Sequence, residues 1–182
     1  MAHLENNCVV HDGCDHIFFV GFLGAGKSTL ARNLGKMFSR TYVDTDRLVE
    51  RALGLSVTEA FASVGESAFR DAETVELRRL EARKSLLVSC GGGIVERPEN
   101  CELMHSMGTI VFLDGDLEDS LRQIQCRERR PDLGTEDEAR RLYAMRRPLY
   151  ERAADLTIDI RNRTFEQVTE ESGRLLWEKG LL

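Results

Sequence analysis

Residues Gly21 to Ser28 combine glycines, a lysine and a serine at a spacing that suits phosphate binding. Their sequence, GFLGAGKS, satisfies G-x-x-x-x-G-K-S, and it stands directly after an apolar run and directly before a helical pattern. Backbone N–H groups of such a loop point inward, and the helix that follows presents the positive end of its dipole. We expect Lys27 to contact the outer phosphates and Ser28 to supply one oxygen ligand to Mg²⁺. The motif predicts a nucleotide-binding loop that includes Gly24, Ala25, Gly26, Lys27, Ser28 and Thr29.

Two carboxylates follow the next apolar run, in the sequence Tyr42-Val43-Asp44-Thr45-Asp46. Residues two apart on extended backbone project to the same side, so Asp44 and Asp46 are expected to face one site at the carboxyl edge of a sheet. Capping of the following helix is the alternative role for Asp at this place. Because Mg-nucleotide is expected at the neighbouring strand end, we assign Asp44 to the metal through water. We assign Asp46 to the acceptor hydroxyl, as orienting group or general base.

Three consecutive glycines, Gly91 to Gly93, follow the apolar run Leu86–Ser89 and Cys90. Where side chains are absent, a ligand can touch backbone amides directly, although a tight turn also tolerates glycine. These glycines therefore mark a second place at the same sheet edge where a ligand can approach the chain.

Arginine supplies 21 of the 25 basic residues of this acidic chain. Its planar guanidinium group suits carboxylate and phosphate oxygens better than an ammonium group does. A solvated helix face with salt bridges is the ordinary explanation for any single arginine, such as Arg70 or Arg146. The other explanation is a pocket for small polyanions.

Short apolar runs alternate with amphipathic stretches along the chain. The alternation predicts an α/β fold with a mostly parallel sheet and helices on both of its faces. Strands are expected at Ile17–Val20, Tyr42–Val43, Leu86–Ser89, Thr109–Leu113 and Leu156–Ile160. Helices are expected at Lys27–Phe38, Asp46–Leu53, Val57–Val64, Glu66–Arg83, Pro98–Met107, Leu117–Gln125, Thr135–Ala153 and Thr164–Trp177.

Composition narrows the class of protein. The chain has 182 residues, a length that favours a single domain, expected at residues 16–182 after a flexible tail at residues 1–15. The spacing of Cys and His in this tail matches no usual zinc pattern. It has no apolar run long enough to span a bilayer and no secretory signal pattern. A net charge of -6 argues against nucleic acid as a partner, and five scattered cysteines indicate a reducing compartment. We therefore expect a cytoplasmic protein that binds neither nucleic acid nor membrane. We also expect it to be a monomer, although no feature of the composition determines the oligomeric state.

The motifs together carry a resemblance to the shikimate kinase family. In order they are GFLGAGKST, the DTD of Asp44–Asp46, GESAFR ending at Arg70, GGG at Gly91–Gly93, RP at Arg130, and R-x-P-L-Y from Arg146. The similarity covers roughly Ile17 to Trp177, and DTD, GGG and R-x-P-L-Y are more specific than the nucleotide loop that many kinases share.

The resemblance implies a fold, a reaction and a set of site residues. The fold is a three-layer P-loop NTPase fold of the nucleoside-monophosphate-kinase type, with a five-stranded parallel sheet and a lid. The reaction transfers the γ-phosphoryl group of ATP to the 3-hydroxyl of shikimate, a step toward chorismate and the aromatic amino acids. The resemblance places shikimate at Asp46, Arg70, Gly92, Gly93 and Arg146; ATP and Mg²⁺ at Lys27, Ser28 and Asp44; and the transferred phosphoryl group near Arg130 of the lid.

The chain departs from the family pattern in the lid. The family sequence there is usually R-P-L-L, whereas this chain has Asp132 after Arg130 and Pro131. An acid pointing inward would repel the nucleotide, so Asp132 is expected to point to solvent when the lid closes. On the adenine side, Arg163 aligns loosely with the family arginine and Arg122 falls one residue from the usual spacing.

Two other functions fit part of the pattern. Another small-molecule P-loop kinase, such as a gluconate kinase, would share the nucleotide loop and use a different acceptor. A kinase-like sensor would bind shikimate or nucleotide without turnover. The combination of Lys27, Asp44, Asp46 and Arg130 favours an enzyme.

Overall fold

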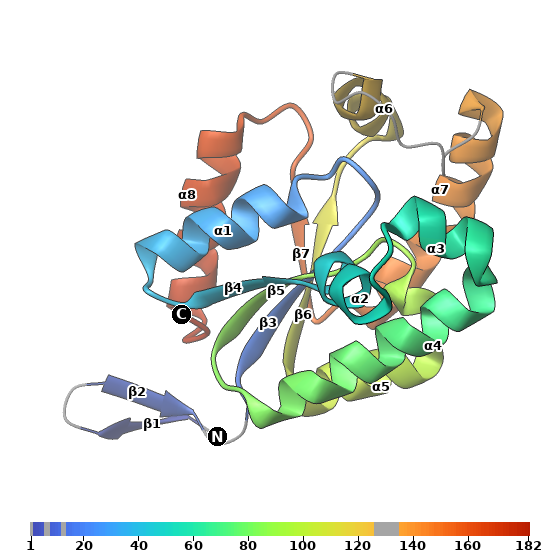
Figure 1. Cartoon of the computed structure of the whole chain (residues 1–182). Helices are drawn as coiled ribbons and strands as arrows, with labels where there is room; N and C mark the ends of the chain where they lie inside the picture. The colour runs from blue at the N-terminus through green and yellow to red at the C-terminus, as the bar shows by residue number, and fades with distance from the viewer. Residues whose placement is uncertain (1, 6–7, 12–13, 126–134) are drawn as a thin grey trace.

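The computed structural model describes the backbone of residues 2–5, 8–11, 14–125 and 135–182, and the side chains of residues 14–121 and 135–182. Its centre is a five-stranded sheet in the order β4-β5-β3-β6-β7 (Figure 1). Every neighbouring pair is parallel. The strands are β3 (His16–Val20), β4 (Thr41–Asp44), β5 (Leu86–Ser89), β6 (Gly108–Asp114) and β7 (Leu156–Asp159). The predicted parallel α/β sheet is confirmed.

Helices cover both faces of the sheet because its central strands β5, β3 and β6 are largely buried on both sides. In β3, Ile17 and Phe19 pack with α1 (Lys27–Met37) and α8 (Phe165–Glu178), while Phe18 and Val20 belong to the core on the opposite face. That second core includes residues of α4 (Gly65–Arg78), α5 (Pro98–Met107) and α7 (Glu136–Ala153). All four of these strand residues are fully buried, and burial of each such side chain contributes roughly 1.5–3 kcal/mol. The result is the predicted three-layer arrangement.

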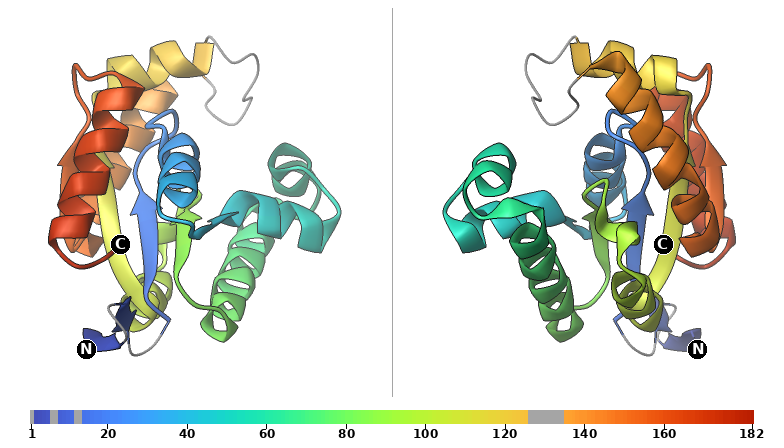
Figure 2. Two further views of the ribbon diagram at one scale, coloured as in Figure 1. Left: turned by 90° about the vertical axis from the view of Figure 1, so that its left-hand side faces the viewer. Right: turned by 90° about the vertical axis from the view of Figure 1, so that its right-hand side faces the viewer.

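A smaller cluster supports the segment between β4 and α4. Val49 of α2 (Thr45–Leu53), Ala60 of α3 (Val57–Ser63) and Phe69 of α4 are buried against one another. Ser56 and Glu59 form a reciprocal capping box that starts α3. Figure 2 shows α2 and α3 projecting from one side of the molecule, away from α8. This segment therefore has its own apolar support beside the main sheet.

Two regions differ from the sequence expectations. The helix expected over 66–83 ends as an α-helix at Arg78 and continues as the 3-10 turn η1 (Arg79–Ala82). Near the N-terminus, β1 (Ala2–Glu5) and β2 (Cys8–His11) form an antiparallel pair that is separate from the main sheet. The structure also contains η2 (Ile94–Glu96) and α6 (Leu117–Gln125). The division into a tail over 1–15 and a domain over 16–182 stays a prediction.

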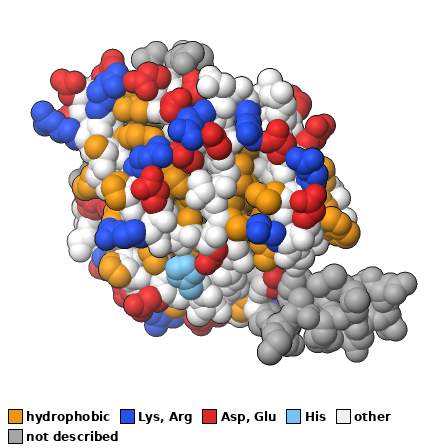
Figure 3. Space-filling view, turned by 180° about the vertical axis from the view of Figure 1, so that it is seen from behind, with side chains coloured by type: hydrophobic (Ala, Val, Ile, Leu, Met, Phe, Trp, Pro, Cys, Tyr) orange, Lys and Arg blue, Asp and Glu red, His pale blue; other side chains and the backbone are white. Residues whose placement is uncertain are grey.

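Charged side chains of both signs are interspersed on the face seen in Figure 3. Within the described part of the chain, no helix has the length and apolarity needed to cross a membrane.

Candidate active site

The glycine-rich loop connects β3 to α1 at the carboxyl edge of the sheet. Gly24 and Gly26 have φ values of 80°, in the left-handed region, and a Cβ on Gly24 would lie 2.8 Å from the Ser120 carbonyl oxygen. The Lys27 side chain is buried, and its Nζ donates hydrogen bonds to the carbonyl oxygens of Gly21 (2.8 Å) and Phe22 (2.9 Å). The fold thus holds a lysine cation within a loop whose conformation requires glycine.

Ser28 and Asp44, predicted as metal-site residues, lie in direct contact. Ser28 Oγ donates to Asp44 Oδ2 at 3.0 Å and lies 3.0 Å from Ser89 Oγ, and the Tyr42 hydroxyl donates to the same carboxylate oxygen at 3.1 Å. Such an all-oxygen donor set fits Mg²⁺. In the described residues, no group of three or more His, Cys, Asp or Glu side chains could hold a metal. A Mg²⁺ ion held by Ser28 and Asp44 would take phosphate oxygens and water as its other ligands.

Asp44 and Asp46 lie at the same sheet edge, as predicted. The reason given for this prediction, that the two residues alternate along one extended strand, is wrong. Asp44 is the last extended residue, with φ −127° and ψ 122°, and α2 already begins at Thr45. Asp44 Oδ1 also accepts a hydrogen bond from Arg47 N, so the carboxylate caps α2 as well as contacting Ser28. Asp46 is placed by the first helical turn instead. The two carboxylates consequently serve neighbouring places, with Asp44 beside Ser28 and Asp46 beside Gly91.

Backbone and side chains join the DTD segment to the glycine triplet. Gly91 N donates to the buried Thr45 Oγ1 at 2.8 Å. A Cβ on Gly91 would collide with Asp46 Oδ1 and lie 2.8 Å from Glu73 Oε1. Two carboxylates therefore converge on this glycine, and only a residue without a side chain leaves room for them.

Arg70 is a buried cation held between carboxylates and aromatic rings. Its NH1 donates to Glu73 Oε2 at 3.0 Å and its NH2 to Glu66 Oε1 at 3.3 Å. The guanidinium carbon lies 5.8 Å and 5.7 Å from the ring centroids of Phe61 and Phe69. Among the described residues, Arg70 Nε and Glu73 Oε1 are buried without a hydrogen-bond partner. A polar ligand beside this pair could satisfy both atoms.

Burial raises the pKa of Glu73 to about 7, although the neighbouring Arg70 cation opposes the change and the Asp46 carboxylate reinforces it. The ordinary value is 4.5. Between pH 4.5 and about pH 7, the Glu73 carboxyl group is therefore more often protonated in the folded chain than in the unfolded chain. The stabilisation is fully present below the unfolded-state pKa and is lost as the pH rises through about 7.

The variant Glu73→Gln should therefore gain stability relative to the unsubstituted protein as the pH rises from about 5 to about 7.5, by on the order of 1 kcal/mol for each pH unit. Urea unfolding of both proteins at the two pH values measures this difference. The variant Glu66→Gln removes an exposed carboxylate from the same arginine and controls for the lost ion pair. A difference between Glu73→Gln and the parent that does not change with pH contradicts the raised pKa.

Arg146 comes from α7 and reaches the same glycine turn as Arg70. Its Nε donates to Glu96 Oε1 at 2.7 Å, and its NH1 would lie 3.4 Å from a Cβ on Gly92. A Cβ on Gly93 would collide with the guanidinium group of Arg70. The Tyr150 hydroxyl, also on α7, donates to the Gly92 carbonyl oxygen. The structure thus brings together Arg70, Gly92, Gly93 and Arg146, which are far apart in the sequence.

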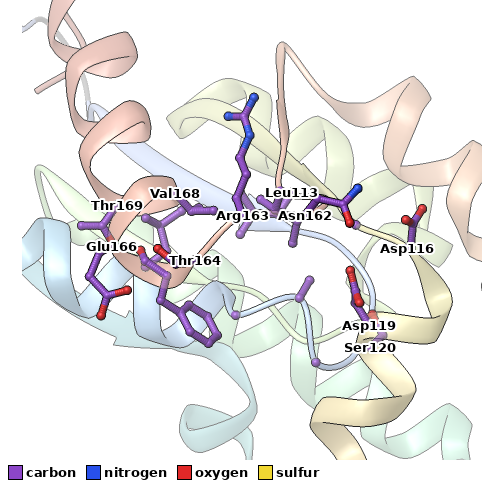
Figure 4. Close-up of a pocket in the computed structure, with 17 residues that line it drawn as sticks. Leu113, Asp116, Asp119, Ser120, Asn162, Arg163, Thr164, Glu166, Val168 and Thr169 are labelled. Atoms are coloured by element: carbon purple, nitrogen blue, oxygen red, sulfur yellow. Dashed lines mark hydrogen bonds between the residues drawn. The ribbon is translucent and has the colours of Figure 1, made fainter.

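A cavity of about 660 Å³ adjoins the phosphate-binding loop (Figure 4). It is bordered by Gly24–Gly26, by Asp119 and Ser120 of α6, and by the segment that leads into α8. Arg163 lines this cavity, although its NH1 donates to Glu171 and its side chain extends away from Asp119 and Ser120 in Figure 4. The cavity has the position expected for the nucleoside part of a nucleotide whose phosphates lie on the loop.

Part of the predicted site falls outside the described residues. The expectations for Arg130 and Asp132 concern residues that the structure does not describe, and the same holds for the side chain of Arg122. Sequence reasoning missed Glu73, Glu96 and the anchoring role of Tyr150. The spacing of three between Arg70 and Glu73 was a usable signal for an ion pair on one helix. Nothing in the local sequence marks Glu96.

Comparisons with known proteins agree on one family. The family model described as shikimate kinase matches residues 23–176. Shikimate kinase from Synechococcus elongatus is 40% identical over 156 residues, which make up 84% of this chain and 81% of that protein. Shikimate kinase from Caldanaerobacter subterraneus is 36% identical over 159 residues, covering 86% of this chain and 92% of that protein.

A solved structure gives the same answer. The structure of shikimate kinase from Acinetobacter baumannii in complex with shikimate superposes with a TM-score of 0.80 at 32% identity, over 92% of this chain and 93% of that one. Sequence, fold and family model therefore coincide over nearly the whole domain, and the chain belongs to the shikimate kinase family.

Proposed function

We propose that this ATP-dependent kinase binds shikimate between Asp46, Arg70, Gly92, Gly93 and Arg146 and phosphorylates its 3-hydroxyl group, giving shikimate 3-phosphate. The observation that carries the proposal is the meeting of two buried guanidinium groups over one glycine turn, beside Asp46 and at the same sheet edge as Lys27 and Ser28. Guanidinium groups suit a carboxylate, and the neighbouring carboxylates suit hydroxyl groups, so the site matches a hydroxylated carboxylic acid.

The proposed nucleotide site needs positioning and charge neutralisation more than covalent chemistry. Lys27 contacts the outer phosphates in this scheme, and Gly24, Ala25, Gly26 and Thr29 supply the surrounding loop. Ser28 would hold Mg²⁺ directly and Asp44 would hold it through water, and Arg163 would border the nucleoside. When bound, Mg²⁺ supplies neutralising charge to the phosphate oxygens.

Asp46 is proposed to act on the acceptor. It accepts a hydrogen bond from the 3-hydroxyl group of shikimate and orients that oxygen for in-line attack, or removes its proton. Arg70 and Arg146 hold the carboxylate of shikimate, and each charge-assisted hydrogen bond contributes roughly 1.5–3 kcal/mol. Arg130, which lies outside the described residues, is proposed to stabilise the transferred phosphoryl group and to keep water from reacting with ATP.

A coupled ADP-release assay with ATP and Mg²⁺ tests this function. Shikimate should give turnover well above the rate without acceptor, whereas gluconate should not. Turnover with gluconate alone would support a different small-molecule kinase. Binding of shikimate in calorimetry without any turnover would support a sensor. Removal of Mg²⁺ with EDTA should abolish the shikimate-dependent rate. We further propose that the active form is a monomer and that it is cytoplasmic.

A further inference from the structure

A third carboxylate, Glu96, lies between the two arginines proposed to bind shikimate. Its Oε1 accepts from Arg146 Nε at 2.7 Å, and its Oε2 lies 3.6 Å from Arg70 NH2. The side chains of Arg70 and Arg146 are 8% and 9% exposed, while that of Glu96 is 22% exposed. Glu96 therefore bridges two buried cations from a position that keeps some access to solvent.

The backbone holds Glu96 close to the glycine turn. Glu96 is the last residue of η2, and its N–H donates to the Gly93 carbonyl oxygen at 3.0 Å. Gly92 and Gly93 are the glycines against which the two guanidinium groups pack. The Glu96 carboxylate consequently meets the same two cations, over the same turn, that the carboxylate of shikimate needs.

The ion pair with Glu96 offsets the cost of burying the Arg146 cation. A buried guanidinium group without a partner is costly, because it loses its hydration and gains nothing in exchange. Arg70 has Glu73 and Glu66 as further partners. In the described part of the chain, Glu96 is the ion-pair partner that the structure gives Arg146. Glu96 thus compensates a charge that a substrate carboxylate would otherwise compensate.

We propose that Glu96 is an internal competitor for the carboxylate of the acceptor, which shikimate displaces from Arg146 when it binds. This inference rests on the proposed function and adds a residue that sets acceptor affinity and selectivity. Binding exchanges one carboxylate for another at the arginine pair, so part of the attraction of the pair is already satisfied in the free protein. A neutral acceptor analogue does not compete with Glu96 for the pair, so Glu96 weakens the binding of an anionic acceptor and leaves that of a neutral one unchanged.

A merely positioning role for Glu96 makes the opposite prediction. If Glu96 holds Arg146 in the geometry that substrate requires, its removal weakens binding. If Glu96 competes, its removal strengthens binding. The sign of the change in shikimate affinity therefore separates the two roles.

The variant Glu96→Gln keeps the size of the side chain and removes its charge. We expect its KM for shikimate, and its Kd for shikimate by calorimetry, to fall about tenfold, which corresponds to roughly 1.4 kcal/mol. The KM for ATP and kcat should change by less than about twofold, because the nucleotide lies at the other end of the site. The neutral methyl ester of shikimate should not share the gain, so the preference for acid over ester should rise about tenfold in the variant.

Glu99→Gln is the matched control. Glu99 lies three residues after Glu96 and forms an exposed ion pair with Arg97. It should leave both KM values unchanged. The variant Glu96→Ala, tested in the same way, covers the case in which Gln keeps a hydrogen bond to Arg146. An unchanged or higher KM for shikimate in both Glu96 variants overturns the inference. Absence of shikimate turnover in the unsubstituted protein would instead overturn the proposed function, so the two failures are distinct.

Discussion

Replacement of Asp46 by Asn should lower kcat with shikimate at least about 10²-fold, the scale of a positioned acid–base group. Asn keeps the shape of the side chain, but its amide neither accepts a proton nor attracts the developing positive charge on the acceptor hydroxyl. Since Asp46 stands beside Gly91 and is proposed to act on the acceptor, the KM for ATP should change little. Steady-state kinetics with each substrate varied in turn measures all three constants.

Stability measurements separate this catalytic role from a structural one. Asp46 is the acidic residue in the first turn of α2, where a carboxylate contributes about 0.3–1 kcal/mol through the helix dipole. The substitution also removes a negative charge that raises the pKa of Glu73, which offsets part of that loss. The thermal midpoint should therefore move little while kcat falls. The control Asp71→Asn removes an exposed carboxylate from α4 and should leave kcat unchanged; a loss below threefold in Asp46→Asn would reduce Asp46 to a helix-terminus residue.

The nucleotide loop was predictable because its chemistry is local. Glycines, Lys27 and Ser28 occupy fixed places within eight consecutive residues, and the strand before them and the helix after them have clear periodicities. The same holds for most of the fold: α5 and α6 have the predicted bounds, and the five strands agree within two residues at each end. Local patterns suffice where the structure depends on neighbours in sequence.

The acceptor site was harder to predict, because its geometry depends on contacts between distant segments. No spacing rule joins Arg70 on α4 to Arg146 on α7, and their assignment came from the family resemblance. Asp46 lies at the predicted edge of the sheet, but the reason given for that prediction was wrong. The prediction assumed extended backbone from Asp44 to Asp46, whereas α2 already begins at Thr45. Glu96 could not be identified from the sequence, because its proposed role depends on contacts with two arginines that other elements bring to it in the folded chain.

Replacement of Arg146 by Ala should raise the KM for shikimate about 10²-fold while the KM for ATP changes little. The lost contact is a charge-assisted interaction of roughly 1.5–3 kcal/mol, and each 1.4 kcal/mol is tenfold in affinity. The variant Arg146→Lys keeps the charge without the planar donor geometry and should recover only part of the loss. Arg141→Ala removes an exposed arginine from the same helix and serves as the control. Unchanged shikimate kinetics in Arg146→Ala would remove Arg146 from the site.

The double variant Arg146→Ala with Glu96→Gln connects this result to the proposed competition. If Glu96 lowers affinity by occupying Arg146, then Glu96→Gln should improve the KM for shikimate about tenfold in the parent protein and far less where Arg146 is absent. If both substitutions act independently, the two effects on log KM add. Independence would mean that the carboxylate acts through Arg70 or through the general charge of the site, because an exchange at Arg146 requires Arg146. Non-additivity of about 1 kcal/mol or more, with no such coupling for Glu99→Gln, is the result expected from a carboxylate that shikimate must displace.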